Sequence, residues 1–299
     1  MKTLINFIAI GILTSVACQA VQAQTNLQEY TPSILLNRGQ WEFKHFTNVY
    51  TQTKAFDDEL RKDDQRVDGR QTFATAINQF MYGINPKYSL GLDVWVKYAT
   101  FNDTQGQRDR VGLTGVGPKI KIAPFEGASR LSIQSTFLIP VSSDTESREP
   151  TATNPFLFLE FDRYLWINEI FYDIPLSSST QLFIRGSIWT SFPRDSFRNR
   201  AFVETPITVF FNYFPFALLS LYTSLESLVN IVDYFQDTDG MSANRFKFAS
   251  SFFSQAGLGA KYQLIPGLLE GELLYTNFWL GSPGEGAGQT FNFGLRVIH

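Results

Sequence analysis

The sequence is poor in cysteine, methionine, histidine and charged residues. It holds one cysteine, three methionines and two histidines in 299 residues, and 18% of its residues are charged, whereas soluble domains average about 25%. The 44% of apolar residues excludes a disordered chain, and the single cysteine excludes a small disulfide-stapled protein. The 25 basic and 28 acidic residues are spread without a basic tract, so we expect no binding to nucleic acid.

The first 23 residues have the pattern of a secretory signal peptide. Lys2 supplies a positive charge, residues 4–17 are almost wholly apolar, and Val21-Gln22-Ala23 places small residues at a cleavage site. The apolar run is shorter than the ~20 residues that a membrane-spanning helix needs. A lipoprotein alternative stays open, because Cys18 ends a stretch that loosely resembles a lipobox. After cleavage before Gln24 the mature chain has no cysteine, so a large core or a closed sheet must stabilise it.

Residues 88–99 alternate between apolar side chains and small or polar ones. The even positions are Tyr88, Leu90, Leu92, Val94, Val96 and Tyr98. A period of two is that of a β-strand with one apolar face. The same alternation recurs over residues 130–141, 181–189, 203–213, 247–263 and 291–297. Most of the mature chain therefore reads as strands.

The connections between these strands are of two kinds. Short ones lie near residues 85–87, 125–128, 175–178, 215–216 and 266–267, and longer polar ones cover residues 56–70, 102–110, 142–155, 193–201, 233–245 and 281–289. Short turns on one side and long loops on the other are typical of an outer-membrane barrel. We therefore predict an all-β protein, a transmembrane up-and-down antiparallel β-barrel of about 12 strands over residues 38–299, preceded by a periplasmic segment of residues 24–37.

Two segments do not fit one pattern alone. Residues 156–173 contain charged residues in the middle, and neither set of alternate positions is wholly apolar. A β-bulge, or a strand that extends above the membrane, would account for this pattern. Residues 218–233 fit helical spacing as well as strand alternation. We favour the strand, because a helix there would leave an unpaired sheet edge within the membrane.

The non-apolar strand faces carry small residues and charges of both signs, which suits a crowded, polar barrel interior. We expect these charged side chains to line the lumen: Asp93, Lys97, Lys119, Lys121, Arg185, Lys261, Glu270, Glu272 and Arg296. Tyrosines at the ends of apolar faces are typical of the aromatic girdle at a membrane surface. The girdle candidates are Tyr88, Tyr98, Tyr213 and Tyr262. The lumen-side aromatics Trp95, Phe183, Trp189 and Phe253 would either fill the interior or form a track for solutes.

The last strand places Phe291, Phe293, Leu295 and Val297 at every second position. It resembles the closing strand that the bacterial outer-membrane assembly machinery recognises, although that strand usually ends in an aromatic residue and this one ends in His299. The chain as a whole resembles the medium-sized barrels of the porin and transporter type. The resemblance implies residence in the outer membrane, contact with its lipid, and passage of small solutes.

Catalysis is not expected, and an outer-membrane hydrolase is the least favoured of the three functions that the sequence leaves open. Outer-membrane phospholipases resemble this chain in strand number and use a Ser–His–Asn constellation, but no Ser and Asn neighbour His45 in the sequence to form that motif. Without a mature cysteine and with two histidines, we expect no metal site and no cofactor. The sequence leaves open whether the lumen is open or closed with the loops acting as a binding surface, whether Gln24–Asn37 blocks it, and which oligomer forms.

Overall fold

The computed structural model describes residues 35–63, 69–102, 109–125, 130–141, 159, 163–194, 200–235 and 245–299. The expected signal peptide and most of the expected periplasmic segment lie outside these ranges. None of the described residues belongs to a helix that is long and apolar enough to cross a membrane.

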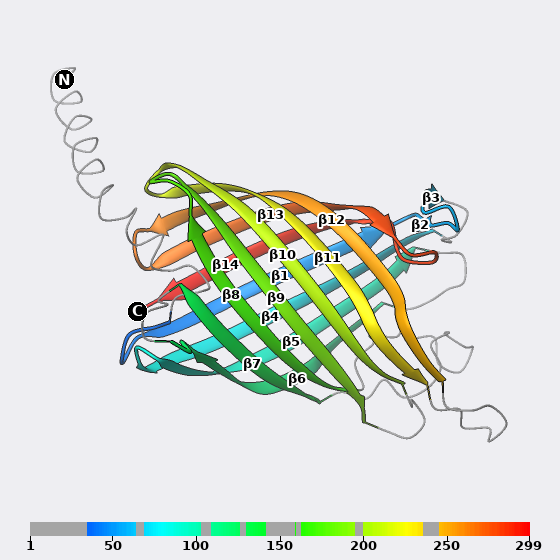
Figure 1. Cartoon of the computed structure of the whole chain (residues 1–299), viewed down its shortest axis with the longest axis horizontal. Helices are drawn as coiled ribbons and strands as arrows, with labels where there is room; N and C mark the ends of the chain where they lie inside the picture. Colours follow the sequence, from blue (N-terminus) through cyan, green and yellow to red (C-terminus); the bar gives the residue numbers. More distant parts are fainter. Residues whose placement is uncertain are drawn as a thin grey trace, which may run out of the picture.

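Twelve antiparallel strands form one closed barrel (Figure 1). Each strand pairs with its neighbours in the sequence, and β14 pairs with β1 to close the sheet. The predicted fold class is confirmed. The barrel strands are β1 (Trp41–Gln52), β4 (Arg70–Asn85), β5 (Tyr88–Asn102), β6 (Arg110–Ile122), β7 (Leu131–Pro140), β8 (Arg163–Pro175), β9 (Thr180–Pro193), β10 (Arg200–Phe216), β11 (Leu219–Phe235), β12 (Arg245–Ile265), β13 (Leu269–Gly281) and β14 (Gln289–Ile298).

Short turns and long loops lie at opposite ends of the barrel, as the sequence predicts. Residues 86–87, 217–218 and 266–268 are short turns, and Gly267 supplies the positive φ of 72° in the last of them. The two ends of the barrel chain meet at the short-turn end, where Trp41 N donates to His299 O at 2.8 Å. The strands extend slightly into the expected turns: β4 ends at Asn85, β8 at Pro175 and β10 at Phe216, so the β10–β11 turn follows Phe216 instead of containing it.

The two ambiguous segments are strands where they are described. Residues 219–235 form β11, so the strand interpretation is confirmed. β11 pairs with β10 and β12 along its length. A register shift between Asn230 and Val232 changes which alternate positions of β11 face inward on its two sides. Of residues 156–173, Arg163 onward forms β8, and the rest lies outside the described residues apart from Leu159.

The apolar faces of the strands point outward. Ile207 is 53% exposed, Leu258 66% and Leu273 62%, although each belongs to a strand that is paired on both sides. Side chains at the intervening positions, such as Thr208 and Thr276, are buried inside the ring. A closed sheet with apolar side chains outside and polar ones inside is the arrangement of a membrane-spanning barrel.

A second, two-stranded sheet lies at the long-loop end of the barrel. It consists of β2 (Ala55–Phe56) and β3 (Lys62–Asp63), in the connection between β1 and β4 (Figure 1). Phe56 is fully buried against Phe278 and Ala287, and its backbone N donates to Glu285 O at 2.9 Å. The β1–β4 loop and the β13–β14 loop are therefore held in contact by side-chain packing and a backbone hydrogen bond.

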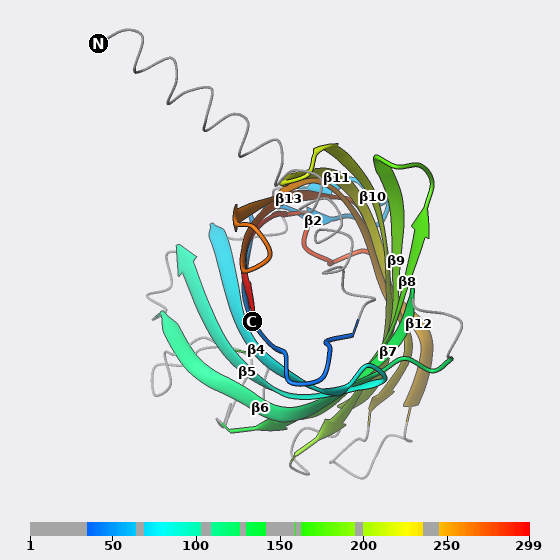
Figure 2. The same ribbon diagram turned by 90° about the vertical axis from the view of Figure 1, so that its left-hand side faces the viewer.

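Chain segments outside the strands also pack against the inner wall. Leu159, from the β7–β8 connection, packs with Trp95, Ala99 and Leu138. At the opposite end, Leu36 packs against Met81 and Ile298, and Figure 2 shows the chain before β1 crossing the near mouth of the barrel. Both ends of the lumen are thus narrowed by residues that do not belong to the barrel strands.

Candidate functional site: the polar wall of the lumen

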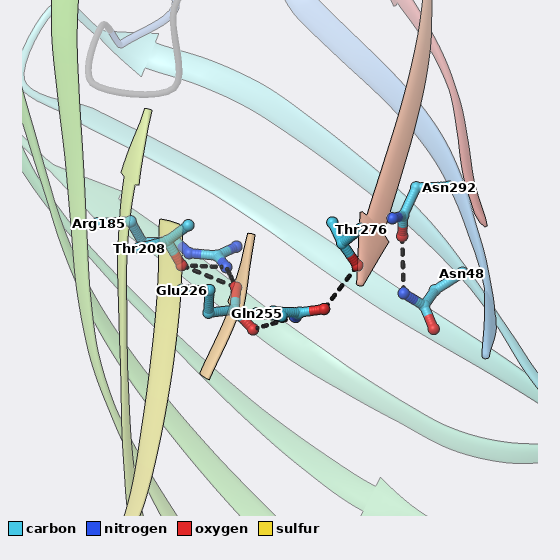
Figure 3. A network of polar contacts seen from close by, with 7 residues as sticks. All are labelled: Asn48, Arg185, Thr208, Glu226, Gln255, Thr276 and Asn292. Atoms are coloured by element: carbon cyan, nitrogen blue, oxygen red, sulfur yellow. Dashed lines mark hydrogen bonds and ion pairs between the residues drawn. The ribbon is translucent and has the colours of Figure 1, made fainter. Parts of the chain in front are cut away.

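A hydrogen-bonded group of polar side chains crosses the inner wall at β9, β10 and β11. Arg185 Nη2 lies 2.9 Å from Thr208 Oγ1 and 3.1 Å from Glu226 Oε2 (Figure 3). Thr208 Oγ1 also donates to Glu226 Oε2 at 2.9 Å. The three residues lie on adjacent strands at inward positions, so the period of two alone brings them to the same face.

The group continues onto β12 and β13. Gln255 Nε2 donates to the second carboxylate oxygen of Glu226 at 2.9 Å, and Thr276 Oγ1 donates to Gln255 Oε1 at 2.6 Å. Farther around the wall, Asn48 on β1 donates to Asn292 on β14 at 2.7 Å (Figure 3). We call the seven residues Asn48, Arg185, Thr208, Glu226, Gln255, Thr276 and Asn292 the polar belt. It combines a fixed cation, a fixed anion and neutral donors on one wall of the lumen.

Two acidic–basic groups lie nearer the short-turn end. Glu42 accepts from Arg296 Nε at 2.6 Å and from Lys44 Nζ at 3.0 Å. Glu272 accepts from the Tyr222 hydroxyl and lies 3.7 Å from Lys261 Nζ. Such mixed pairs lower the cost of placing charge inside a membrane-spanning structure.

On the opposite wall the charges are buried. Lys119 Nζ lies 2.7 Å from Asp93 Oδ2, with side chains 1% and 2% exposed. Gln79 Nε2 donates to the same oxygen at 3.2 Å. The Arg185 and Glu226 side chains are 33% and 20% exposed, so the two walls differ. Water therefore reaches the Arg185 and Glu226 side chains but not the Asp93–Lys119 pair.

The structure places all nine predicted lumen residues on inward positions, but it does not bring them together into one cluster. Asp93 pairs with Lys119, Lys261 with Glu272, and Glu270 lies opposite Arg296 in the β13–β14 register. Lys97 Nζ donates to Leu159 O at 3.4 Å, and Lys121 Nζ lies 5.6 Å from the centre of the Phe171 ring. Arg185 belongs to the polar belt.

Most of the uncharged belt and three charged lumen residues were not predicted from the sequence. Glu42 and Lys44 open the first strand, where alternation is hard to recognise, and Glu226 lies in the segment that also fits a helix. Alternation extended into β1 and β11 would have identified all three as inward-facing.

Three of the four girdle candidates lie on the outer surface near the short turns. Tyr88, Tyr213 and Tyr262 are 47%, 46% and 43% exposed. Tyr98 lies nearer the long loops and donates to Asp109 Oδ2 at 3.0 Å. The lumen aromatics are mostly packed: Trp95 and Phe183 are buried, and Phe253 lies 4.9 Å from the Phe278 ring centre. These contacts fit side chains that fill the barrel interior better than side chains that form a track for solutes.

Comparisons with known proteins give a fold but no family. No family model and no curated protein matches the chain. Among solved structures, it is similar to the COG4313 outer membrane channel from Pseudomonas putida F1, with 11% identity, a TM-score of 0.66, and coverage of 90% of this chain and 98% of the other. This chain has the fold of a bacterial outer-membrane barrel.

Two further structures resemble the chain more distantly. One is the translocator domain of the autotransporter NalP from Neisseria meningitidis, with 7% identity, a TM-score of 0.48, and coverage of 96% and 97% of the two chains. The other is the NanC porin, with 8% identity, a TM-score of 0.45, and coverage of 85% and 98%.

Proposed function

We propose that this barrel lets small polar solutes pass through its lumen. The observation that carries the proposal is the polar belt, whose two charged members, Arg185 and Glu226, are hydrogen-bonded to each other and remain partly exposed on the inner wall. Side chains that hydrogen-bond to one another in this way present polar atoms to a passing solute. They avoid the desolvation free energy of an unpaired charge inside the barrel. The other lumen charges, among them Lys261 and Glu272, extend the same polar surface toward the short-turn end.

Arg185 and Glu226 oppose one another in sign, so we expect weak selectivity between cations and anions. Removing either charge alone leaves the other unbalanced in the lumen, and a ring or wall charge sets the preferred sign of the passing ion. The proposal therefore predicts opposite effects for the two neutralising substitutions.

The test uses the purified full chain in planar lipid bilayers under a salt gradient. We expect measurable conductance, a shift of the permeability ratio toward cations of about twofold in Arg185→Gln, and a similar shift toward anions in Glu226→Gln. Ile207→Val, on the lipid-facing surface of the same wall, is the matched control and leaves the ratio unchanged. A complete lack of conductance, with loops intact and with loops trimmed, would contradict the proposal.

A second candidate is a surface-binding barrel with a closed lumen that acts through its outer loops. The fastening of the β2–β3 loop to the β13–β14 loop through Phe56 favours it, because a rigid loop surface is suited to recognition. Unchanged solute uptake in a deletion strain, together with loss of a bound partner when residues 56–70 or 142–155 are trimmed, would select this candidate.

We propose further that residues 1–23 direct export and that β14 is the strand read by the assembly machinery. Its outward positions are apolar, with Phe291 and Phe293 exposed by 51% and 44%, and its pairing with β1 closes the sheet. Phe293→Ser is expected to slow membrane insertion of a pulse-labelled chain, and normal insertion would argue against this role.

A further inference from the structure

Three cations surround one carboxylate on the inner wall near the short-turn end. Glu42 on β1 accepts from Arg296 Nε at 2.6 Å and from Lys44 Nζ at 3.0 Å. Lys121 on β6 also interacts electrostatically with Glu42, although β4 and β5 lie between the two strands. We call Glu42, Lys44, Lys121 and Arg296 the Glu42 group. Lys44 and Arg296 already outnumber the single carboxylate, and Lys121 adds to the positive excess.

The neighbouring acidic residues leave part of this excess in place. Asp93 neutralises Lys119, whose Nζ lies 2.7 Å from Asp93 Oδ2. Glu169 lies farther around the wall, on β8, where it interacts with Asp93. Glu270 is opposite Arg296 in the β13–β14 register and offsets at most one positive charge. The surroundings of Glu42 therefore keep a net positive charge.

The member of the Glu42 group that faces the lumen is Lys44. Its side chain is 27% exposed, against 8% for Glu42 and 12% for Arg296. Lys121 is buried, and its Nζ lies 5.6 Å from the centre of the Phe171 ring. The carboxylate thus lies behind an exposed ammonium, so the surface that the group presents to a solute is positive.

Lys44 also keeps hydrogen-bond donors for a solute. An ammonium has three N–H donors, and among the residues that the structure describes Glu42 is the one ion-pair partner of Lys44. The other oxygen of Glu42 accepts from Arg296, so the carboxylate holds both cations in place. An ammonium beside a guanidinium is a pair of groups that binds the oxygen atoms of carboxylates and phosphates.

We propose that the Glu42 group is a binding site for the carboxylate or phosphate group of a small anionic solute. Lys44 contacts the anion, and Arg296 and Lys121 add positive potential. Glu42 is a positioning residue that keeps the cations together. Excess charge of one sign between low-dielectric walls concentrates the counter-ion, so the solute is drawn to this level of the lumen.

This inference rests on the proposed passage of solutes and names their class as small organic acids and phosphates. The polar belt gives no such preference, because Arg185 and Glu226 balance one another in sign. The two levels of the lumen therefore differ: the belt is neutral overall, and the Glu42 group selects anions.

The binding test uses isothermal titration calorimetry on the purified full chain in micelles of a neutral detergent at low salt. The probes are sodium succinate, sodium phosphate and the uncharged succinamide. We expect succinate or phosphate to bind to the wild-type chain and succinamide not to bind. The tighter of the two anions shows whether the site prefers a carboxylate or a phosphate group, and either preference supports the proposal.

Removing the charge of Lys44 is expected to weaken anion binding. Lys44→Gln deletes a charged hydrogen-bond donor, so Kd should rise about tenfold. Lys44→Arg keeps the charge and should bind the anion within about threefold of the wild-type Kd. Lys87→Gln is the matched control, because it removes a lysine charge from the exposed β4–β5 turn at the same end of the barrel. Its Kd should equal that of the wild type.

A second measurement uses the wild-type chain and does not depend on the folding of a variant. The lysines are acetylated with dilute acetic anhydride, with and without a saturating concentration of the tighter-binding anion, and the modified peptides are quantified by mass spectrometry. We expect the anion to slow acetylation of Lys44 several-fold and to leave the rate at the exposed Lys87 unchanged.

Three results would overturn the inference. The first is a wild-type chain that conducts ions in bilayers but binds neither anion. The second is a folded Lys44→Gln chain with the wild-type Kd, and the third is acetylation of Lys44 at the same rate with and without the anion. None of them contradicts the passage of solutes. Conversely, a chain that binds the anion without any conductance would contradict passage and leave this binding site in place.

Discussion

Inside this barrel, the surroundings of each charged residue decide its contribution. Asp93 and Lys119 are almost fully buried with a 2.7 Å contact between Lys119 Nζ and Asp93 Oδ2, whereas the Arg185 and Glu226 side chains are partly exposed. A buried ion pair contributes to stability mainly because neither charge is left buried without a partner. A partly exposed pair can also interact with a solute. The same residue types therefore have a structural role on one wall and a proposed selective role on the other.

The buried pair gives a stability prediction. Lys119→Met leaves the Asp93 carboxylate without its partner and is expected to lower the free energy of unfolding by about 3 kcal/mol. The double variant Asp93→Leu/Lys119→Met removes both charges and should recover most of that loss. The measurement is urea unfolding in lipid vesicles. A double variant as unstable as Lys119→Met would show that packing, not the lone charge, causes the loss.

At the scale of single elements, the β2–β3 loop depends on tertiary contacts. Two strands of two residues cannot be stable alone. Phe56 anchors them, and Ala287 N donates to Lys54 O at 2.9 Å on the opposite side of the loop. Gly281 leaves the space for the Phe56 ring, since a Cβ there would overlap it.

Phe56→Ala is expected to release this loop from the β13–β14 loop. Removing a buried phenyl ring costs about 3–5 kcal/mol, which exceeds what the remaining backbone contacts of so short a sheet supply. We expect rapid cleavage after Arg61 by added trypsin, with the barrel strands still protected. The exposed Leu60→Ala is the control, and resistance of Phe56→Ala to trypsin would show that the loop does not depend on this anchor.

The same loop gives a pH prediction. The Asp57 carboxylate accepts the backbone N–H groups of Arg61 and Glu59, and these bonds hold the pKa of Asp57 below its usual value of 3.8. A lowered folded-state pKa stabilises the loop at neutral pH, and that stabilisation is lost as the pH falls through the lowered value. The protection factors of the Glu59 and Arg61 amides, each measured against the intrinsic exchange rate at the same pH, should therefore be kept at pH 4 and fall only in stronger acid. Protection factors already lowered at pH 5 would contradict this.

For the whole molecule, closure of the sheet is what makes outward apolar faces possible. Every barrel strand has two partners, so the bilayer meets side chains and not unpaired backbone groups. The outward residues, among them Ile207, Leu258 and Leu273, then gain stability from lipid instead of from a core.

The lipid-facing surface can be tested by one charge. Ile207→Arg near the middle of β10 is expected to lower the free energy of unfolding in vesicles by about 2–4 kcal/mol, because an arginine in the middle of the bilayer loses hydration. Ile207→Val should cost less than about 1.5 kcal/mol. If Ile207→Arg lowers the free energy of unfolding by less than Ile207→Val does, this face of β10 does not contact lipid hydrocarbon.

The sequence by itself determined the strands, their faces and their order. A period of two needs only neighbouring residues, and the sorting of short turns from long loops fixes an up-and-down barrel with both barrel ends on one side. The same alternation leads to the expectation that nine charged residues, from Asp93 to Arg296, line the lumen.

Only the tertiary structure decided which of these residues meet. Strand register joins Arg185 to Glu226 across 41 positions and His45 to Asn78 across 33. It also decided that Phe56 and Leu159 turn inward from the loops. Such contacts depend on how far one strand slides along the next and on how loops fold over a closed ring, and no local pattern of side chains encodes either.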